Sequence, residues 1–232
     1  MSDEEFVKHA RFEYSLAKSE VAKLDPQEAL IRFYGRLDRA IKTSAESSEV
    51  KPACRAGCSY CCYYKVEAKA VEVFAIQRFV SARFTQQQRE LVVSQARANV
   101  EQAKSLSYEE HLATNQRCPF LIEDQCSIYP VRPSKCRNFH ASEVEGCKKS
   151  YEEPYNLALP NSFIEPILVA ANGATEGFEH AVAETGKDAR TYDLNSAFLE
   201  AMENPASTKR FGGGKKAFIS AKVVSEPGAG AP

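Results

Sequence analysis

The sequence predicts a mainly α-helical protein that contains one irregular, cysteine-rich segment. Apolar residues recur at helical spacing through most of the chain, and no run alternates apolar and polar residues as a half-buried strand does. Residues 118–155, by contrast, carry four prolines and four cysteines, which interrupt any long periodicity. We therefore expect packed helices and, between them, a segment of turns and short helical pieces that something other than a regular backbone ladder holds in place.

The clearest expected helix begins at Asp25. This residue can cap the helix, Pro26 suits its first position, and Glu28 can reach back to the Asp25 amide. The apolar face behind this start consists of Leu30, Phe33, Tyr34, Leu37 and Ile41. Because these residues fall on one side at a period near 3.6, we expect them to face the core.

Other helices follow from weaker signals. Ser2 and Glu5 form a capping-box pattern at the N-terminus, and Thr85 with Gln88 forms another. A helix that starts near Ser162 contains Gly173 and Gly177, which weaken it and leave a break within it open. The remaining helices are expected over about 67–84, 85–112, 162–178 and 194–202.

Composition divides the chain into three parts. Residues 1–50 are expected to form N-terminal helices, and residues 51–204 the cysteine-bearing domain with its closing helices. Residues 205–232 are rich in Gly, Ser, Ala, Pro and Lys, so they are expected to be a disordered tail.

Charge and hydropathy argue against several classes of protein. The formal net charge of -1 gives no electrostatic reason to expect a nucleic-acid partner. No apolar run approaches the roughly 18 residues of a membrane span, so no membrane partner is expected. The acidic start of the chain lacks the layout of a signal peptide. We therefore expect a cytoplasmic protein, in which clustered thiols act as metal or redox ligands rather than forming disulfides; a protein partner is left open.

The eight cysteines fall into two groups separated by about 55 residues. The first group is Cys54, Cys58, Cys61 and Cys62; the second is Cys118, Cys126, Cys136 and Cys147. Four thiolates can complete a zinc site or hold the corners of an iron–sulfur cluster. A single cysteine is more often a small buried hydrophobe, but four within nine positions favour metal binding. The irregular segment would then be stapled by the bound metal.

Two details of the first group bear on the kind of site. Gly57 permits the tight turn that a ligand loop needs before Cys58. Adjacent Cys61 and Cys62 are hard to aim at one ion. Either one of them is a spectator, or the site is polynuclear, or there are two sites.

At these residues the sequence resembles the YkgJ-like cysteine-cluster family of zinc- or iron-chelating domains. The resemblance is carried by Cys54-Arg-Ala-Gly-Cys-Ser-Tyr-Cys-Cys62, Cys118-Pro-Phe-Leu121, Cys126-Ser-Ile-Tyr-Pro-Val-Arg-Pro133 and Cys136-Arg-Asn-Phe139, with Cys147 fitting the pattern beyond them. It implies that all eight cysteines are metal ligands. The cofactor it implies is an iron–sulfur cluster, with [4Fe–4S] favoured, or zinc. Flagellin lysine methylases contain a similar pattern, so a reaction linked to S-adenosylmethionine is an alternative implication.

Three neighbours of the second group could take part in the site. Arg132 and Arg137 could offset the negative charge of a cysteine-bound cluster, or simply make surface and carboxylate contacts. His140 could replace a thiolate as ligand, although a lone histidine is more often a hydrogen-bonded residue. Tyr129 and Phe139 are expected to be core packing.

The function expected first is metal binding with a redox, sensing or structural role. A radical S-adenosylmethionine enzyme is a second hypothesis, because Cys54, Cys58 and Cys61 have the spacing of that cluster motif. The chain lacks the strand–helix alternation of its barrel. A metal-stabilised transferase, such as a protein lysine methyltransferase, is a third hypothesis; no Gly-rich loop after a strand supports it. The sequence names no catalytic residue and leaves open whether the protein is an enzyme.

Overall fold

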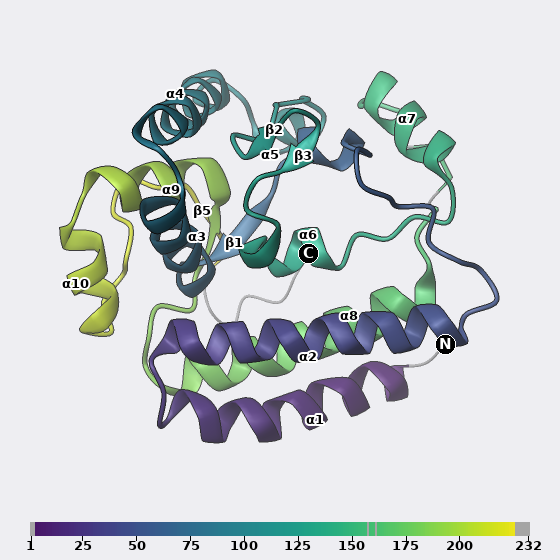
Figure 1. Ribbon diagram of the computed structural model, residues 1–232, viewed down its shortest axis with the longest axis horizontal. Coiled ribbons are helices and arrows are strands. Elements are labelled where there is room, and N and C mark those ends of the chain that lie inside the picture. The colour runs from purple at the N-terminus through teal and green to yellow at the C-terminus, as the bar shows by residue number, and fades with distance from the viewer. Residues whose placement is uncertain (1–2, 157, 161, 226–232) are drawn as a thin grey trace.

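The computed structural model describes residues 3–156, 158–160 and 162–225, and in this part of the chain it is mainly helical (Figure 1). The α-helices are α1 (Asp3–Val21), α2 (Pro26–Ser47), α3 (Ala70–Arg83), α4 (Gln86–Ala103), α5 (Tyr108–Leu112), α6 (Ser134–Arg137), α7 (Val144–Glu152), α8 (Glu165–Glu184), α9 (Leu194–Glu203) and α10 (Ala206–Gly212). The 3-10 helices are η1 (Tyr60–Tyr63) and η2 (Tyr129–Val131). The short strands are β1 (Glu67–Lys69), β2 (Leu121–Ile122), β3 (Gln125–Cys126), β4 (Thr191–Asp193) and β5 (Val223–Ser225). The mainly helical fold class is therefore confirmed.

Helices α1, α2 and α8 pack together as one layer, at the bottom of Figure 1. The apolar face predicted for α2 is buried as expected, and Asp25 caps the helix by accepting a hydrogen bond from the Gln27 amide at 3.0 Å. Phe33 of α2 stacks on Phe178 of α8, with 4.3 Å between the ring centroids. The salt bridge from Arg36 to Glu13, at 2.6 Å, ties α2 to α1.

The glycines of α8 do not break the helix, which settles the question that the sequence left open. Helix α8 runs without interruption from Glu165 to Glu184, and α1 lies directly against both glycines. A Cβ atom added to Gly173 would lie 2.6 Å from the Phe6 carbonyl oxygen, and one added to Gly177 would lie 2.2 Å from the Ala10 carbonyl oxygen. The glycines therefore serve a close helix–helix approach, which outweighs their poor helix propensity.

Strands β1, β4 and β5 form a small antiparallel sheet, with β4 in the middle. Ala68 of β1 pairs with Tyr192 of β4, and Thr191 of β4 pairs with Ser225 of β5. This sheet joins the chain just after the first cysteine group to its C-terminal part. Helices α3, α4 and α9 pack beside it and complete the core.

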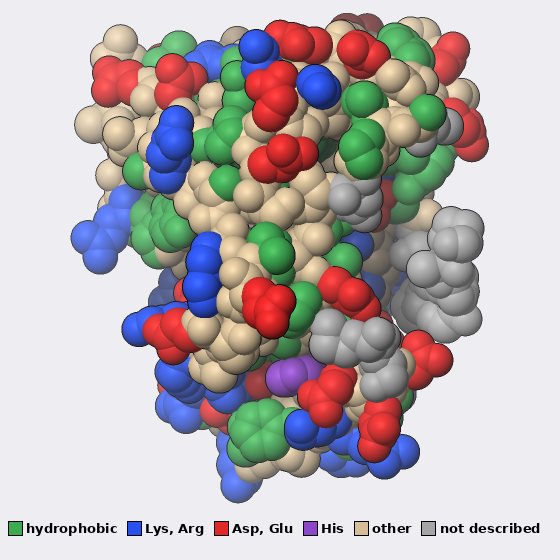
Figure 2. Space-filling model, turned by 90° about the vertical axis from the view of Figure 1, so that its right-hand side faces the viewer, with side chains coloured by type: hydrophobic (Ala, Val, Ile, Leu, Met, Phe, Trp, Pro, Cys, Tyr) green, Lys and Arg blue, Asp and Glu red, His purple; other side chains and the backbone are tan. Residues whose placement is uncertain are grey.

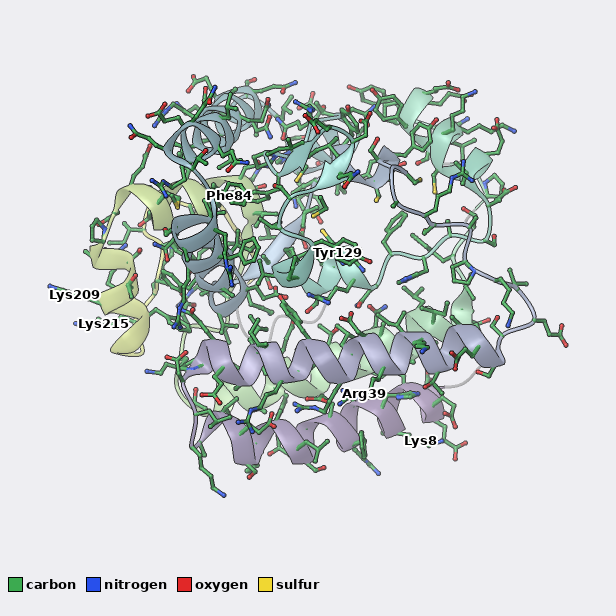
Figure 3. The ribbon with its side chains drawn as sticks, in the orientation of Figure 1. Lys8, Arg39, Phe84, Tyr129, Lys209 and Lys215 are labelled. Atoms are coloured by element: carbon green, nitrogen blue, oxygen red, sulfur yellow. The ribbon has the colours of Figure 1, made fainter. Side chains whose placement is uncertain are left out.

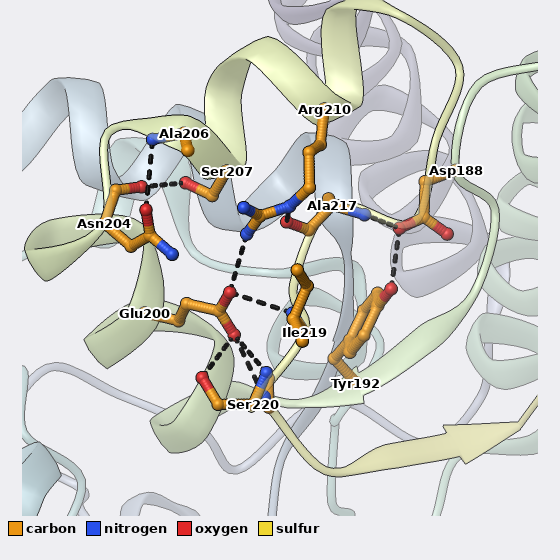
Figure 4. A network of polar contacts seen from close by, with 11 residues as sticks. Asp188, Tyr192, Glu200, Asn204, Ala206, Ser207, Arg210, Ala217, Ile219 and Ser220 are labelled. Carbon is orange, nitrogen blue, oxygen red and sulfur yellow. Dashed lines mark hydrogen bonds and ion pairs between the residues drawn. The ribbon is translucent and has the colours of Figure 1, made fainter.

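The expected disordered tail is wrong for residues 205–225, which form α10, a connecting loop and β5 (Figure 4). The Glu200 carboxylate on α9 accepts hydrogen bonds from the backbone amides of Ile219, Ser220 and Ala221 at 2.8–3.0 Å. Phe218 in this loop is fully buried. Order comes from partners distant in sequence, which local composition does not reveal. Residues 226–232 lie outside the described residues.

One face of the molecule carries side chains of both charges, in keeping with a net charge near zero. Figure 2 shows acidic and basic side chains intermingled on one face of the molecule. In the part of the chain that the structure describes, no helix is both long enough and apolar enough to cross a membrane.

Candidate metal centre

The first cysteine group lies on a turn and a 3-10 helix. Gly57 has a φ of 83°, which confirms the expected tight turn, and the Cys58 amide donates to the Arg55 carbonyl at 3.1 Å. The next four residues form η1, which carries Cys61 and Cys62. The interaction with the Cys62 thiol, and then burial, raise the pKa of Cys61. The adjacent thiols are therefore neighbours in space as well as in sequence.

Backbone hydrogen bonds join the second cysteine group to the first. The Cys118 amide donates to the Cys62 carbonyl oxygen at 2.7 Å, and the Gln116 amide donates to the Tyr63 carbonyl oxygen at 2.8 Å. These bonds hold two segments that are far apart in the chain side by side. Cys118 of the second group is thereby bonded directly to Cys62 of the first group through the backbone.

The hairpin formed by β2 and β3 presents Cys126. Its turn residues Glu123 and Asp124 have φ values of 49° and 55°, the left-handed conformation that two-residue hairpin turns require. Cys126 pairs with Leu121 across the two strands. The adjacent Ser127 secures the hairpin, because its amide donates to the Phe120 carbonyl at 2.9 Å.

Helix α6, which carries Cys136, is fixed by a buried carboxylate that the sequence analysis missed. Oε1 of Glu72 accepts hydrogen bonds from the amide and the hydroxyl of Ser134, each at 2.8 Å, and from the Tyr34 hydroxyl at 3.0 Å. Glu72 is 4% exposed and stands among apolar residues of α3. A single acidic residue inside an apolar run was the signal that could have identified it.

Helix α7 brings Cys147 to the same region. The Tyr64 hydroxyl donates to the Cys147 carbonyl oxygen at 3.1 Å, and the Tyr151 ring packs on Tyr63 with 5.0 Å between centroids. Cys54 reaches the region from the other side, since its thiol lies 4.0 Å from the Phe139 carbonyl oxygen. Most sulfur atoms drawn in Figure 3 lie between the β2–β3 pair and α7.

Seven of the thiols divide into two sets, according to the neighbouring thiols whose charges raise their pKa. We call Cys61, Cys118, Cys126 and Cys136 the inner set, and Cys54, Cys58 and Cys147 the outer set. Burial, and then the charges of Cys61 and Cys126, raise the pKa of Cys136 to about 12. Burial, and then the charges of Cys54, Cys58 and Cys61, raise the pKa of Cys147 to about 11. Each set therefore gathers thiols closely enough for their charges to repel.

Arg132 supplies positive charge to the inner set. Burial raises the pKa of Cys126 and of Cys136, and the Arg132 guanidinium acts against both shifts. The guanidinium stacks on the Tyr129 ring at 4.1 Å from its centroid, and its buried Nε atom has no hydrogen-bond partner among the described residues. Tyr129 (labelled in Figure 3) is 59% exposed, so the expectation that it packs in the core is wrong. Its ring orients Arg132 instead.

Arg137 has a different position. Its guanidinium is bonded to Asp38 of α2 at 2.7 Å and to the Pro130 carbonyl oxygen at 2.6 Å, and it stacks on the Tyr34 ring at 4.0 Å. These contacts make Arg137 a tie between the cysteine segment and α2. Of the two arginines considered from the sequence, the structure favours Arg132 for charge compensation.

The structure gives His140 no contact with a thiol. Burial, and then the charge of Arg132, lower the pKa of His140, and its Nδ1 atom has no partner among the described residues. Its carbonyl oxygen accepts a hydrogen bond from the Ile164 amide at 3.2 Å.

The donor set fits a soft metal cation. All eight cysteines are free thiols, and only Cys54 is exposed. Burial and mutual repulsion disfavour the thiolates, and a bound cation would supply the missing positive charge. In the described ranges no three His, Cys, Asp or Glu side chains are arranged as a ready-made metal site. The metal staple expected from the sequence is therefore a proposal.

A comparison with protein families found a match over the cysteine segment. Residues 53–156 match the family model described as "CxxCxxCC: Putative zinc- or iron-chelating domain". This match confirms the resemblance noted in the sequence, and all eight cysteines lie inside the matched residues. Searches of curated proteins and of solved structures found no match.

Proposed function

We propose that this protein binds an iron–sulfur cluster through its clustered thiolates and uses it in a redox, sensing or structural role. The observation that carries the proposal is that the chain holds eight free thiols in two groups, and a hydrogen bond from the Cys118 amide to the Cys62 carbonyl oxygen at 2.7 Å joins the two groups. A [4Fe–4S] cluster is the form we favour, and zinc is the alternative metal.

The inner set is the stronger candidate for the cluster ligands. Its four cysteines make up the four-cysteine ligand set that is usual for such clusters. Arg132 would offset the negative charge of the bound group. The bound cluster would supply reversible one-electron chemistry. Cys62 could take the place of Cys61 as a ligand in this set.

The outer set adds three thiols close to the first. Cys54, Cys58 and Cys147 could extend the same polynuclear site or hold a second metal with Cys62 or Cys61. Either arrangement accounts for eight cysteines better than a single zinc ion does, because tetrahedral zinc takes only four ligands.

Anaerobic purification followed by metal analysis, acid-labile sulfide analysis and an absorption spectrum tests the proposal. Iron and sulfide in equal amounts, with a broad visible absorption, would support an iron–sulfur cluster. Zinc without sulfide would replace it with the zinc alternative. A colourless, metal-free protein whose cysteines are all rapidly alkylated would overturn metal binding altogether.

The clustered thiols also bear on the compartment in which the protein works. Clustered free thiols suit a reducing compartment, so we infer a cytoplasmic protein. We put forward no S-adenosylmethionine-linked activity, since the described residues contain only short strands and no barrel of alternating strands and helices.

A further inference from the structure

Arg132 is a cation without a partner of opposite charge. Within the part of the chain that the structure describes, its guanidinium makes no ion pair and no hydrogen bond, and its buried Nε atom lacks an acceptor. Arg137, by contrast, is paired with Asp38 at 2.7 Å. A buried donor on an unpaired cation is costly, so an anion beside Arg132 would be stabilising.

The backbone and the side chain of Arg132 are both held in place. The Arg137 guanidinium donates to the Pro130 carbonyl oxygen at 2.6 Å and to the Arg132 carbonyl oxygen at 3.0 Å. The Arg132 guanidinium stacks on the Tyr129 ring, 4.1 Å from its centroid. The ring is mostly exposed and the Arg132 Nε atom is buried, so the guanidinium lies on the inner side of the Tyr129 ring.

Three thiols of the inner set respond to this charge. Burial raises the pKa of Cys126 and of Cys136, and the Arg132 charge acts against both shifts. The Cys62 thiol, and then burial, raise the pKa of Cys61, and the Arg132 charge again acts in the opposite direction. The three thiols come from β3, α6 and η1, and charges in a protein act over about 10 Å. The guanidinium therefore lies beside thiols from three separate elements.

A fixed cation at this place bears on electron transfer. An iron–sulfur cluster held by cysteines gains one negative charge on reduction, and its potential depends on the net charge around it. A nearby positive charge stabilises the reduced state more than the oxidised state and so raises the potential. Lys135 is also next to Cys136 in the sequence, but it is exposed, so water screens its charge. Arg132 is the better placed of the two.

We propose that Arg132 sets the reduction potential of the bound cluster and that Tyr129 is the positioning residue that holds the guanidinium in place. This inference rests on the iron–sulfur function proposed above. Tyr129 acts only through Arg132, because its ring face carries the stack. The phenol hydroxyl takes no part in that contact, so a phenylalanine ring can replace it.

Anaerobic redox titration of the full-length, cluster-loaded protein tests the proposal, with visible absorption as the readout. The variants are Arg132→Gln, which removes the charge, Tyr129→Leu, which removes the ring, and Tyr129→Phe, which keeps it. Lys135→Gln is the matched control, because it removes an equal charge from an exposed position beside Cys136. Iron and sulfide analysis normalises each titration to the loaded fraction, so a variant that loads less cluster still gives a potential.

We expect Arg132→Gln to shift the ratio of reduced to oxidised cluster about tenfold toward the oxidised state, which corresponds to a potential lower by about 59 mV for one electron. Tyr129→Leu should give a smaller shift in the same direction. Tyr129→Phe and Lys135→Gln should keep the wild-type potential. An unchanged potential in Arg132→Gln, or an equal drop in Lys135→Gln, would overturn the proposal.

The wild-type protein separates this inference from the proposed function. A wild type that loads a cluster, with a potential that Arg132→Gln leaves unchanged, refutes the role of Arg132 alone. A wild type that holds zinc without sulfide, or no metal, refutes the iron–sulfur function and the role of Arg132 together.

Discussion

Replacing Gly177 by Ala tests whether the close approach of α1 and α8 stabilises the fold. The added methyl group would lie 2.2 Å from the Ala10 carbonyl oxygen and 2.9 Å from the Tyr14 amide nitrogen. Both atoms belong to the backbone, so the clash can be relieved only if the helices move apart. Such overpacking costs about 1–3 kcal/mol or more, which exceeds the gain of about 1 kcal/mol in helix propensity.

The matched control is Gly35→Ala in α2. The nearest atom to its added methyl group is a nitrogen of the Arg39 side chain at 3.8 Å, an ordinary contact. This variant should therefore show only the helix-propensity gain, about 0.5–1 kcal/mol in the free energy of unfolding.

Thermal or urea unfolding followed by circular dichroism measures both changes. We expect Gly177→Ala to unfold several degrees below the wild type, because about 1 kcal/mol corresponds to roughly 2–4 °C in a chain of this size. We expect Gly35→Ala to unfold slightly above it. A Gly177→Ala protein as stable as Gly35→Ala would refute the reasoning, since it would show that α1 does not pack on the glycine face of α8.

Three further predictions concern the metal centre, Glu179 and the C-terminal loop. Replacing Cys58 by Ser should lower the metal content and increase protease cleavage within residues 118–155; unchanged metal stoichiometry and unchanged protease resistance would contradict this. Burial raises the pKa of Glu179 from 4.5 to about 7, against the opposing charge of Lys69. The folded protein therefore binds the Glu179 proton more tightly than the unfolded chain does. The stability that this binding contributes is complete below pH 4.5 and should be lost as the pH rises through 7. The Glu179→Gln variant should lack this pH-dependent part of the free energy of unfolding in urea titrations at pH 5 and pH 8, and identical pH dependence in the two proteins would count against the prediction. Replacing Glu200 by Ala should lower the free energy of unfolding by about 1–3 kcal/mol, because several buried amides lose their acceptor; limited proteolysis should then cut near Ser220, and a resistant loop would argue against this role.

The sequence predicted the elements that have strong local signals. The face of α2, its cap at Asp25 and the capping box of α4 at Thr85 are all confirmed. The single helix expected over 85–112 is instead α4 and the short α5, which begins at its own cap, Ser107. Strands β1, β4 and β5 escaped prediction because each has only three residues, too few to show an alternating pattern.

The prediction of the candidate site succeeded for residue types and failed for the contacts between distant residues. The cysteines and the turn at Gly57 could be identified from spacing and composition. The hydrogen bond between Cys118 and Cys62, and the support of Ser134 by Glu72, join residues more than 50 positions apart. Arg132 could not be told from Arg137 by sequence, because the difference lies in Asp38, which pairs with only one of them.

The packing of α1 and α2 against α8 has a consequence for the order of folding. More than 100 residues separate the end of α2 at Ser47 from the start of α8 at Glu165, so this layer closes a long loop. A metal that joins Cys54 to Cys147 beforehand would shorten the effective loop to about a quarter of its length. The entropic cost of closing this loop would then fall by about 1–2 kcal/mol in free energy. Chains that acquire their metal early should therefore fold faster than chains that acquire it late.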